Sequence, residues 1–212
     1  MKKDFNELLD IIRRLRAPGG CPWDREQTHL SLKKHLIEEA YEAADAIDEG
    51  NSVKIADELG DVLLQIVMHA QIGSEEGTFD INDVTDAICT KMIVRHPHVF
   101  SDVNAETSDE VLKNWDEIKK RERGQNTTAE AMESVTRSLP SLTRSVKVIS
   151  KADKAGLIDT LNAVNASSEE CQGKRLFEIC LDCYNKRLDP EEELYSYIKK
   201  IIKKFKNIEE NT

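Results

Sequence analysis

The chain has few aromatic residues, few glycines and no long apolar run, and each shortage narrows the possible structures. Aromatic residues make up 5% of its 212 residues, and it contains nine glycines. This composition favours helices over a strand-rich and turn-rich fold. No apolar stretch approaches the roughly 18 residues of a membrane-spanning helix, so we expect a cytoplasmic protein with no membrane partner.

Positive charge is also scarce, with 30 Lys and Arg residues against 40 Asp and Glu residues and a formal net charge of −10. Nucleic acid and anionic membranes do not attract such a chain, so neither is expected as a partner. The five cysteines are odd in number and scattered, which argues against a disulfide framework. Cys180 and Cys183 form an isolated Cys-x-x-Cys within an apolar helical pattern, which we interpret as packing rather than redox or metal chemistry.

Apolar residues recur at helical intervals in the first hundred residues and predict four helices. These helices span about residues 5–17, 28–50, 52–72 and 82–95, with a loop over 21–27, an N-cap at Ser52 and a turn from Gly73 to Gly77. The apolar stripes expected to be buried include Leu32, Leu36, Ala40, Ala43, Ile47, Ile55, Leu59, Val62, Leu63, Ile66, Val67, Ala70, Val84, Ile88, Met92 and Val94. Because about two residues join the second and third helices, these two should be antiparallel.

Two pairs of acidic residues stand at helical spacing on these antiparallel helices. Glu39 and Glu42 share one face of the second helix, and Glu58 and Asp61 share one face of the third. Like charges at this spacing destabilise a helix by roughly 0.2–0.5 kcal/mol per pair, and a hard divalent cation removes that cost. Four carboxylates without histidine or thiolate favour Mg²⁺ over zinc and predict a site for a polyphosphate. The alternative is a solvated acidic surface.

Several sequence blocks, in consecutive order, resemble the MazG family of nucleoside triphosphate pyrophosphohydrolases. They are Gly20-Cys21-Pro22-Trp23-Asp24-Arg25-Glu26-Gln27-Thr28, Glu38-Glu39-x-x-Glu42, Glu58-x-x-Asp61, Glu76-Gly77-x-Phe79-Asp80 and Arg95-His96-Pro97-His98-Val99-Phe100. The resemblance covers about residues 5–123. It implies an all-α fold, a MazG-like four-helix bundle, here with a helical C-terminal extension. It also implies a homodimer, Mg²⁺ as cofactor with Mn²⁺ as a substitute, and cleavage of NTP or dNTP to NMP or dNMP and pyrophosphate.

The resemblance also assigns roles to single residues. Glu39, Glu42, Glu58 and Asp61 match the family's metal ligands. Glu38 is displaced around the helix from Glu39, so it either accepts a proton from the attacking water, binds a second ion or faces solvent.

The candidate substrate contacts are cationic and aromatic residues near these motifs, namely Lys54, Lys91, Arg95, Trp115 and Lys119. Lys54 is chosen because it precedes Glu58 by one helical turn, and ordinary surface charge is the alternative for Lys54, Lys91 and Arg95. Lys91 and Arg95 match a Lys-x-x-x-Arg pair and, with Lys54, would neutralise a triphosphate. Trp115 and Lys119 resemble a Trp-x-x-x-Lys element that stacks on the base and contacts phosphate. A core anchor is the alternative role for Trp115.

Three further residues near these motifs have less defined roles. Trp23 lies in a loop that either covers the site or supports its entrance. His96 and His98 flank a proline and are expected to fix a turn through hydrogen bonds rather than act as bases.

The expected domain organisation is a MazG-like domain over residues 1–123, a linker over 124–138 and a degenerate second repeat over 139–212. Residues 139–156 resemble the opening of a second MazG repeat, but Lys174 stands where an acid is needed, so no second active site is expected. A last helix from about Pro190 should bury the stripe Leu194, Ile198, Ile201, Ile202, Phe205 and Ile208, with its lysines in solvent.

Three functions fit this sequence. The first is a general NTP pyrophosphohydrolase with one site per chain. The second is a pyrimidine-preferring dUTP or dCTP pyrophosphatase, against which the Cys-Pro-Trp-Asp and His-Pro-His-Val-Phe blocks argue. The third is a helical regulator that binds nucleotides without turnover.

Overall fold

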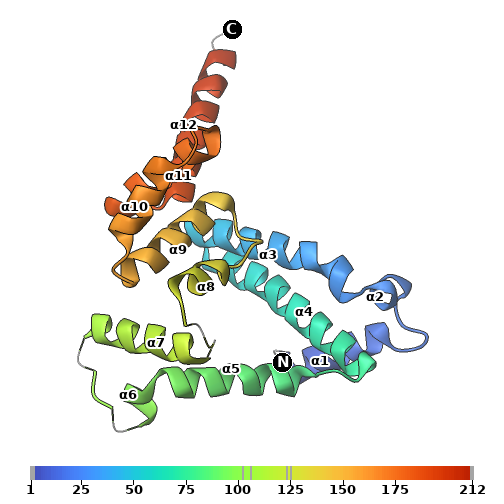
Figure 1. The fold of residues 1–212 in the computed structure, drawn as a ribbon. Coiled ribbons are helices and arrows are strands. Elements are labelled where there is room, and N and C mark those ends of the chain that lie inside the picture. The colour runs from blue at the N-terminus through green and yellow to red at the C-terminus, as the bar shows by residue number, and fades with distance from the viewer. Residues whose placement is uncertain (1–2, 102, 106, 123, 125, 211–212) are drawn as a thin grey trace. The chain divides into compact units, whose positions relative to one another are not determined.

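The computed structural model describes residues 3–101, 103–105, 107–122, 124 and 126–210. Every regular element within these ranges is a helix, which confirms the predicted all-α class (Figure 1). The chain divides into two compact units, residues 1–106 and 107–212. Among the described helices, none is both long enough and apolar enough to cross a membrane.

The first unit is built around an antiparallel pair of long helices. Its helices are α1 (Phe5–Arg16), α2 (Pro22–Glu26), α3 (His29–Glu49), α4 (Ser52–Glu76), α5 (Ile81–Arg95) and α6 (Pro97–Phe100). Helices α3 and α4 lie side by side along most of their length, while α1 and α5 each pack on α4 (Figure 1). The predicted antiparallel arrangement is therefore confirmed.

The short connection between α3 and α4 is defined by its two capping residues. Gly50 ends α3 in a left-handed conformation with φ of 70°, which glycine adopts without steric cost. The Asn51 side chain then accepts hydrogen bonds from the backbone N–H groups of Val53 and Lys54, at 3.1 and 3.4 Å. Asn51 is thus the N-cap, and the prediction that Ser52 has this role is wrong.

Two further boundaries differ from the predicted ones. Residues 22–26, expected to be part of a loop, form α2, which has Pro22 at its first position and is too short to show a periodic pattern. Gly73, expected to begin a turn, is buried within α4, which continues to Glu76 and ends at Gly77.

Residue 73 lies inside α4 and has to be a glycine, because Phe79 packs closely against it. A Cβ atom at residue 73 would lie 2.7 Å from the Phe79 carbonyl oxygen and 2.8 Å from its ring. We expect Gly73→Ala to lower the free energy of unfolding by about 1–3 kcal/mol through overpacking. Gly60, in the same helix, has open space around its Cβ position, so Gly60→Ala should stabilise by about 0.5–1 kcal/mol. Urea denaturation of both variants checks this, and equal effects would contradict it.

The core of the first unit lies where α1, α3 and α4 meet. It contains the buried residues Ile12, Leu32, Val67, Met68 and Ile72, with Leu8, Leu9, Leu15 and Leu64 packed against them. The predicted burial is wrong for several residues of the apolar stripes. Ile47, Leu59, Leu63, Ile66, Ile88 and Val94 are each 36–56% exposed, and Ala40 is exposed as well. Helix α5 has no fully buried residue, because α4 covers only part of its surface in the described unit.

The second unit contains the remaining helices. They are α7 (Ser108–Glu122), α8 (Thr128–Glu133), α9 (Ser141–Lys154), α10 (Ile158–Ser167), α11 (Gln172–Asn185) and α12 (Pro190–Glu209). Helix α9 is central, since α8, α10, α11 and α12 all contact it. Helix α8 lies within residues 124–138, where the sequence suggests a linker. Cys180 and Cys183 are buried on α11, which agrees with the packing role expected for them.

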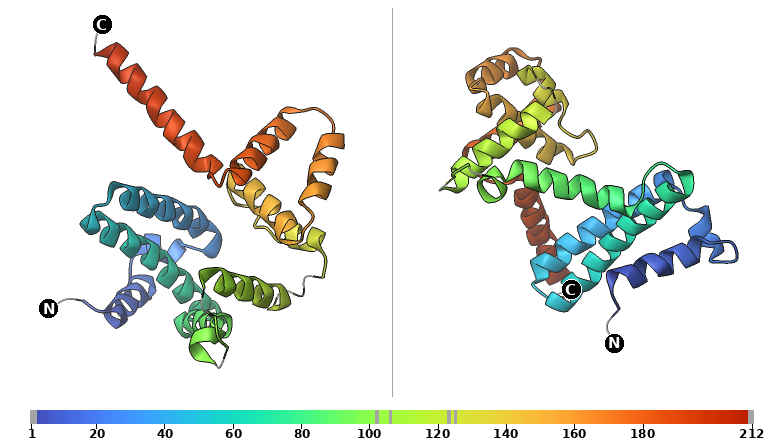
Figure 2. Two further views of the ribbon diagram at one scale, coloured as in Figure 1. Left: turned by 90° about the vertical axis from the view of Figure 1, so that its left-hand side faces the viewer. Right: turned by 90° about the horizontal axis from the view of Figure 1, so that it is seen from below.

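Helix α12 begins at the predicted residue, but its apolar stripe is not buried. Only its N-terminal part contacts α9 and α11, and the rest extends away from them (Figure 2). The six apolar residues from Leu194 to Ile208 that were expected in the core are 37–63% exposed. The periodic pattern correctly predicts an amphipathic helix, while the described chain supplies no surface to cover it.

Candidate metal centre

Three carboxylates from α3 and α4 come together at the middle of the long helix pair. One oxygen each from Glu39, Glu58 and Asp61 can be chosen so that all three lie within 4.8 Å of one another. The i,i+3 spacing of Glu58 and Asp61 places both on the side of α4 that faces Glu39. Three carboxylates this close form an oxygen-only group of the kind that binds a hard divalent cation.

These carboxylates are partly desolvated and repel one another, and both effects raise the pKa values of Glu39 and Glu58. Partial burial raises the pKa of Glu39, and the charges of Asp61, Glu42 and Glu58 raise it further. Partial burial likewise raises the pKa of Glu58, with the charges of Glu42 and Asp61 as the next causes. A bound cation would offset both the desolvation and the mutual repulsion.

The other two acids of α3 lie at the border of this group. Glu42 is outside the set within 4.8 Å, but it is close enough for its charge to act on Glu39 and Glu58. Glu38 instead contacts His35, with 3.1 Å between the Glu38 Oε2 and His35 Nδ1 atoms. Glu38 therefore has a partner of its own, beside the three-carboxylate group rather than within it.

The cationic residues expected to contact phosphate lie on α4 and α5. Lys54 Nζ is 2.6 Å from Glu49 Oε2, across the turn between α3 and α4, and its charge also reaches Glu58. Lys91 is exposed on α5, and Arg95 is half-buried one helical turn further on. Trp115 and Lys119 are half-buried on α7, in the second unit.

A histidine pair joins the N-terminal end of α3 to α4. His29 and His69 share a hydrogen bond of 2.7 Å between their Nδ1 atoms, and their rings are stacked 5.0 Å apart. His29 also stacks on Phe79, while its Nε2 lies 3.7 Å from a Glu76 carboxylate oxygen. Burial lowers the pKa of His69, and the neighbouring His29 lowers it further.

This pair should make the fold sensitive to acid. Because the pKa of His69 is lower in the folded chain than its ordinary value of 6.5, the unfolded chain binds more protons below that pH. We therefore expect Tm to fall by a few degrees between pH 7.5 and pH 5.5. In His69→Gln, which cannot take up the proton, this fall should be smaller. Thermal denaturation at both pH values checks this, and an unchanged difference in the variant would contradict it.

His96 and His98 lie where α5 ends and α6 begins. His96 Nδ1 donates a hydrogen bond of 2.6 Å to the Met92 carbonyl oxygen, which supports the predicted role in fixing a turn. His98 lies in α6, directly after Pro97.

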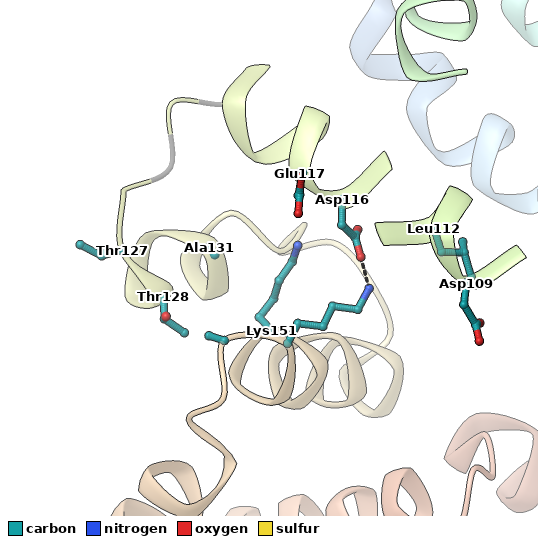
Figure 3. A pocket seen from close by; sticks show the side chains of 10 residues that line it. Asp109, Leu112, Asp116, Glu117, Thr127, Thr128, Ala131 and Lys151 are labelled. Carbon is teal, nitrogen blue, oxygen red and sulfur yellow. Dashed lines mark hydrogen bonds and ion pairs between the residues drawn. The ribbon is translucent and has the colours of Figure 1, made fainter. Parts of the chain in front are cut away.

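A cavity of about 560 Å³ lies in the second unit, between α7 and the helices α8 and α9. It contains none of the predicted site residues. Lys154 forms an ion pair with Asp116 across it, and Lys151 points toward Glu117 (Figure 3). Because its lysines face its own carboxylates, this cavity is a poor match for a triphosphate.

Two residues with defined contacts in the first unit were not predicted from the sequence. His35 lies one helical turn before Glu39, so its i,i+4 spacing was a visible signal. Arg16 pairs with Glu75, 59 residues away, and no local pattern signals that contact.

The helices and the three-carboxylate group together define an all-α protein with a candidate divalent-cation site. Residues 27–100 match the family model described as the MazG nucleotide pyrophosphohydrolase domain. The "Nucleoside triphosphate pyrophosphohydrolase/pyrophosphatase MazG" of Thermotoga maritima is 38% identical over 223 aligned positions, covering 97% of this chain and 86% of that protein. This chain belongs to the MazG nucleotide pyrophosphohydrolase family.

Other relatives are longer than this chain. The "Nucleoside triphosphate pyrophosphohydrolase" of Escherichia coli K12 is 45% identical over 153 residues, which cover 72% of this chain and 58% of that protein. The "Uncharacterized protein YabN" of Bacillus subtilis is 49% identical over 145 residues, which cover 68% of this chain and 29% of that protein. The similarity to these two relatives thus covers only part of their length.

Proposed function

We propose that this chain hydrolyses nucleoside triphosphates to nucleoside monophosphate and pyrophosphate with Mg²⁺ as cofactor. The observation that carries the proposal is the convergence of Glu39, Glu58 and Asp61 within 4.8 Å, in a chain of the MazG family. Relatives named nucleoside triphosphate pyrophosphohydrolase support the same activity. Mn²⁺, which accepts similar oxygen ligands, should substitute for Mg²⁺.

The donor set fits this cation. Glu39, Glu58 and Asp61 offer only carboxylate oxygens, which Mg²⁺ prefers. Glu42, whose charge acts on Glu39 and Glu58, is proposed as a fourth ligand. The raised pKa values of Glu39 and Glu58 indicate that desolvation and repulsion between the carboxylates outweigh the positive charge near them, which for Glu58 comes from Lys54. When bound, Mg²⁺ would polarise the phosphates and stabilise the negative charge that moves onto the pyrophosphate.

The chain's own residues would position the substrate and water around this group. Lys54, Lys91 and Arg95 are proposed to neutralise the triphosphate, with Trp115 and Lys119 contacting base and phosphate. Water attack at the α-phosphorus forms the new P–O bond, and the bond to the bridging oxygen breaks with its electron pair leaving on pyrophosphate.

Glu38 is the proposed acceptor of the water's proton. Its contact with His35 would hold the carboxylate on the border of the site.

A cytoplasmic homodimer is also proposed, since the half-exposed apolar residues Ile88, Ile93 and Val94 of α5 offer a surface for a second copy.

The experiment that tests this function is product analysis of the native chain with a panel of NTPs and dNTPs in the presence of Mg²⁺. We expect equal amounts of monophosphate and pyrophosphate, and no product when Mg²⁺ is chelated. Turnover confined to dUTP or dCTP would instead support a pyrimidine-specific enzyme. Mg²⁺-dependent nucleotide binding without any product would support a regulator, and release of diphosphate and orthophosphate would contradict the proposal.

A further inference from the structure

The apolar stripe of α12 has the spacing of a helix that pairs with another helix. Its residues are separated by four, three, four and three positions in turn, namely Leu194, Ile198, Ile201, Phe205 and Ile208. This alternation is the heptad pattern of a coiled-coil seam, in which each side chain packs between those of a facing helix. All of these residues are helical and 37–63% exposed.

The described part of the chain leaves this seam open. Helix α12 contacts α9 and α11 through its N-terminal part and then extends beyond them (Figure 2). Ile202 and Tyr197, which are 50% and 60% exposed, widen the apolar strip on either side of the seam. A continuous exposed apolar strip beside charged residues is typical of a protein interaction surface.

The charges of α12 are segregated along its length. Glu192 and Glu193 are exposed in the first turn. All the charged residues between positions 194 and 208 are instead lysines, namely Lys199, Lys200, Lys203, Lys204 and Lys206. Two such helices side by side in the same direction would place lysine beside lysine and repel. In opposite directions, the acidic turn of each helix would lie beside the lysines of the other.

One antiparallel register satisfies both the apolar seam and the charges. When Ile198 faces the partner's Ile201, Leu194 faces the partner's Phe205, and the seam is filled along its length. Glu193 and Lys204 are eleven residues apart, which is about three helical turns, so they lie on the same side of the helix. In this register Glu193 lies within about one turn of the partner's Lys204, and the symmetry repeats the pair.

We propose that α12 is an interaction surface for a second copy of this chain, formed by antiparallel pairing of the two α12 helices. A second copy is the occupant because the helix is complementary to itself in the reverse direction, with a matching seam and opposite charges. This surface is separate from the apolar residues of α5, and the pairing does not require nucleotide hydrolysis.

Sedimentation equilibrium of the full chain measures the pairing. Ile201→Glu combined with Phe205→Glu places charges in the seam and should weaken self-association at least about 100-fold. Because both side chains are exposed within one chain, circular dichroism should show unchanged helix content. The matched control is Lys203→Glu, which adds the same side chain on the opposite face of α12 and should stay within about two-fold. The α5 surface is intact in every variant.

A charge exchange tests the direction of the two helices. Glu193→Lys alone should weaken pairing about five-fold, because it places like charges beside each other twice in the symmetric pair. Glu193→Lys combined with Lys204→Glu restores opposite charges in the antiparallel register and should recover most of the affinity. No recovery in the double variant would contradict this register.

Photochemical cross-linking identifies what covers the seam. Phe205→benzoylphenylalanine is introduced into the full chain, and isotopically labelled and unlabelled copies are mixed. We expect a cross-link between copies, close to Leu194 of the partner subunit. A cross-link to the partner's Phe205 would contradict the antiparallel direction, and a cross-link within one chain would contradict pairing by a second copy.

A native chain that stays monomeric, or a seam variant that associates as the native chain does, would overturn the proposal. A monomeric native chain that binds phosphatidylserine vesicles through this stripe would overturn it in favour of a lipid surface. None of these experiments measures hydrolysis, so each of these results would leave the proposed function in place.

Discussion

Replacement of Glu39 by glutamine is expected to reduce pyrophosphate release at least about 100-fold while leaving the chain folded. Glu39 is one of three residues whose carboxylate oxygens lie within 4.8 Å of one another, and a neutral amide is a weaker ligand for Mg²⁺. The loss should affect the turnover of every nucleotide alike, because the missing ligand weakens contacts with the phosphates rather than with the base.

The same variant should show no loss of stability when Mg²⁺ is chelated. The pKa of Glu39 is raised by desolvation and by three neighbouring carboxylates, so removal of its charge relieves repulsion in the folded chain. In the native chain Mg²⁺ should raise Tm, because a ligand that binds only the folded state stabilises it. In Glu39→Gln this rise should be smaller.

The matched control for this prediction is Asp48→Asn, which removes an exposed carboxylate from the same helix outside the candidate centre. It should change neither turnover nor the effect of Mg²⁺ on Tm. Full activity in Glu39→Gln, or an equal loss in Asp48→Asn, would contradict a role for the three-carboxylate group.

Replacement of Arg16 by alanine should lower the free energy of unfolding of the first unit by about 2–3 kcal/mol. Removal of one partner from a buried ion pair usually costs about 3–5 kcal/mol, and the lower figure allows for the 38% exposure of the Glu75 side chain. The variant also removes the donors to the carbonyl oxygens of Asp24 and Gln27. Urea denaturation followed by Trp23 fluorescence, in a Trp115→Phe background, measures the change.

This pair also has a signature at acid pH. The hydrogen bonds from Arg16 hold the pKa of Glu75 below its usual value of 4.5. A carboxyl group with a lowered pKa contributes stability above pH 4.5 and loses it as pH falls through the folded-state value. Arg16→Ala should therefore lose less stability than the native chain between pH 5 and pH 3.

The control for Arg16 is Arg13→Ala, which removes an exposed pair one turn earlier in α1. The side chains of Arg13 and Asp10 are 63% and 70% exposed, so this pair is expected to contribute at most about 0.5 kcal/mol. Equal effects of the two substitutions would contradict the prediction that Arg16 stabilises the first unit through its contacts with Glu75, Asp24 and Gln27.

The residues that sequence reasoning placed correctly are those related by local spacing. Glu58 and Asp61 share a face because they are three residues apart, and Glu39 meets them because a connection of two residues forces α3 and α4 together. The helix end at Gly50 was also predicted, since glycine takes a left-handed conformation that other residues rarely adopt.

The residues that sequence reasoning missed depend on long-range contacts. Arg16 and Glu75 are 59 residues apart, and His29 and His69 are 40 apart, so neither pair leaves a periodic signal. The predicted burial of apolar residues on α5 and α12 was wrong for a related reason. An apolar stripe shows which face of a helix avoids water, but not whether the same chain supplies a surface to cover it.

Divalent-cation binding shows directly whether Glu39, Glu58 and Asp61 form a metal centre. Mn²⁺ binding can be followed by the loss of the electron paramagnetic resonance signal of free Mn²⁺, in the native chain and in Asp61→Asn. We expect that the native chain binds Mn²⁺, that Mg²⁺ displaces it and that Asp61→Asn binds at least about ten-fold more weakly. Equal binding by a folded Asp61→Asn, or no binding by the native chain, would contradict a metal centre formed by Glu39, Glu58 and Asp61.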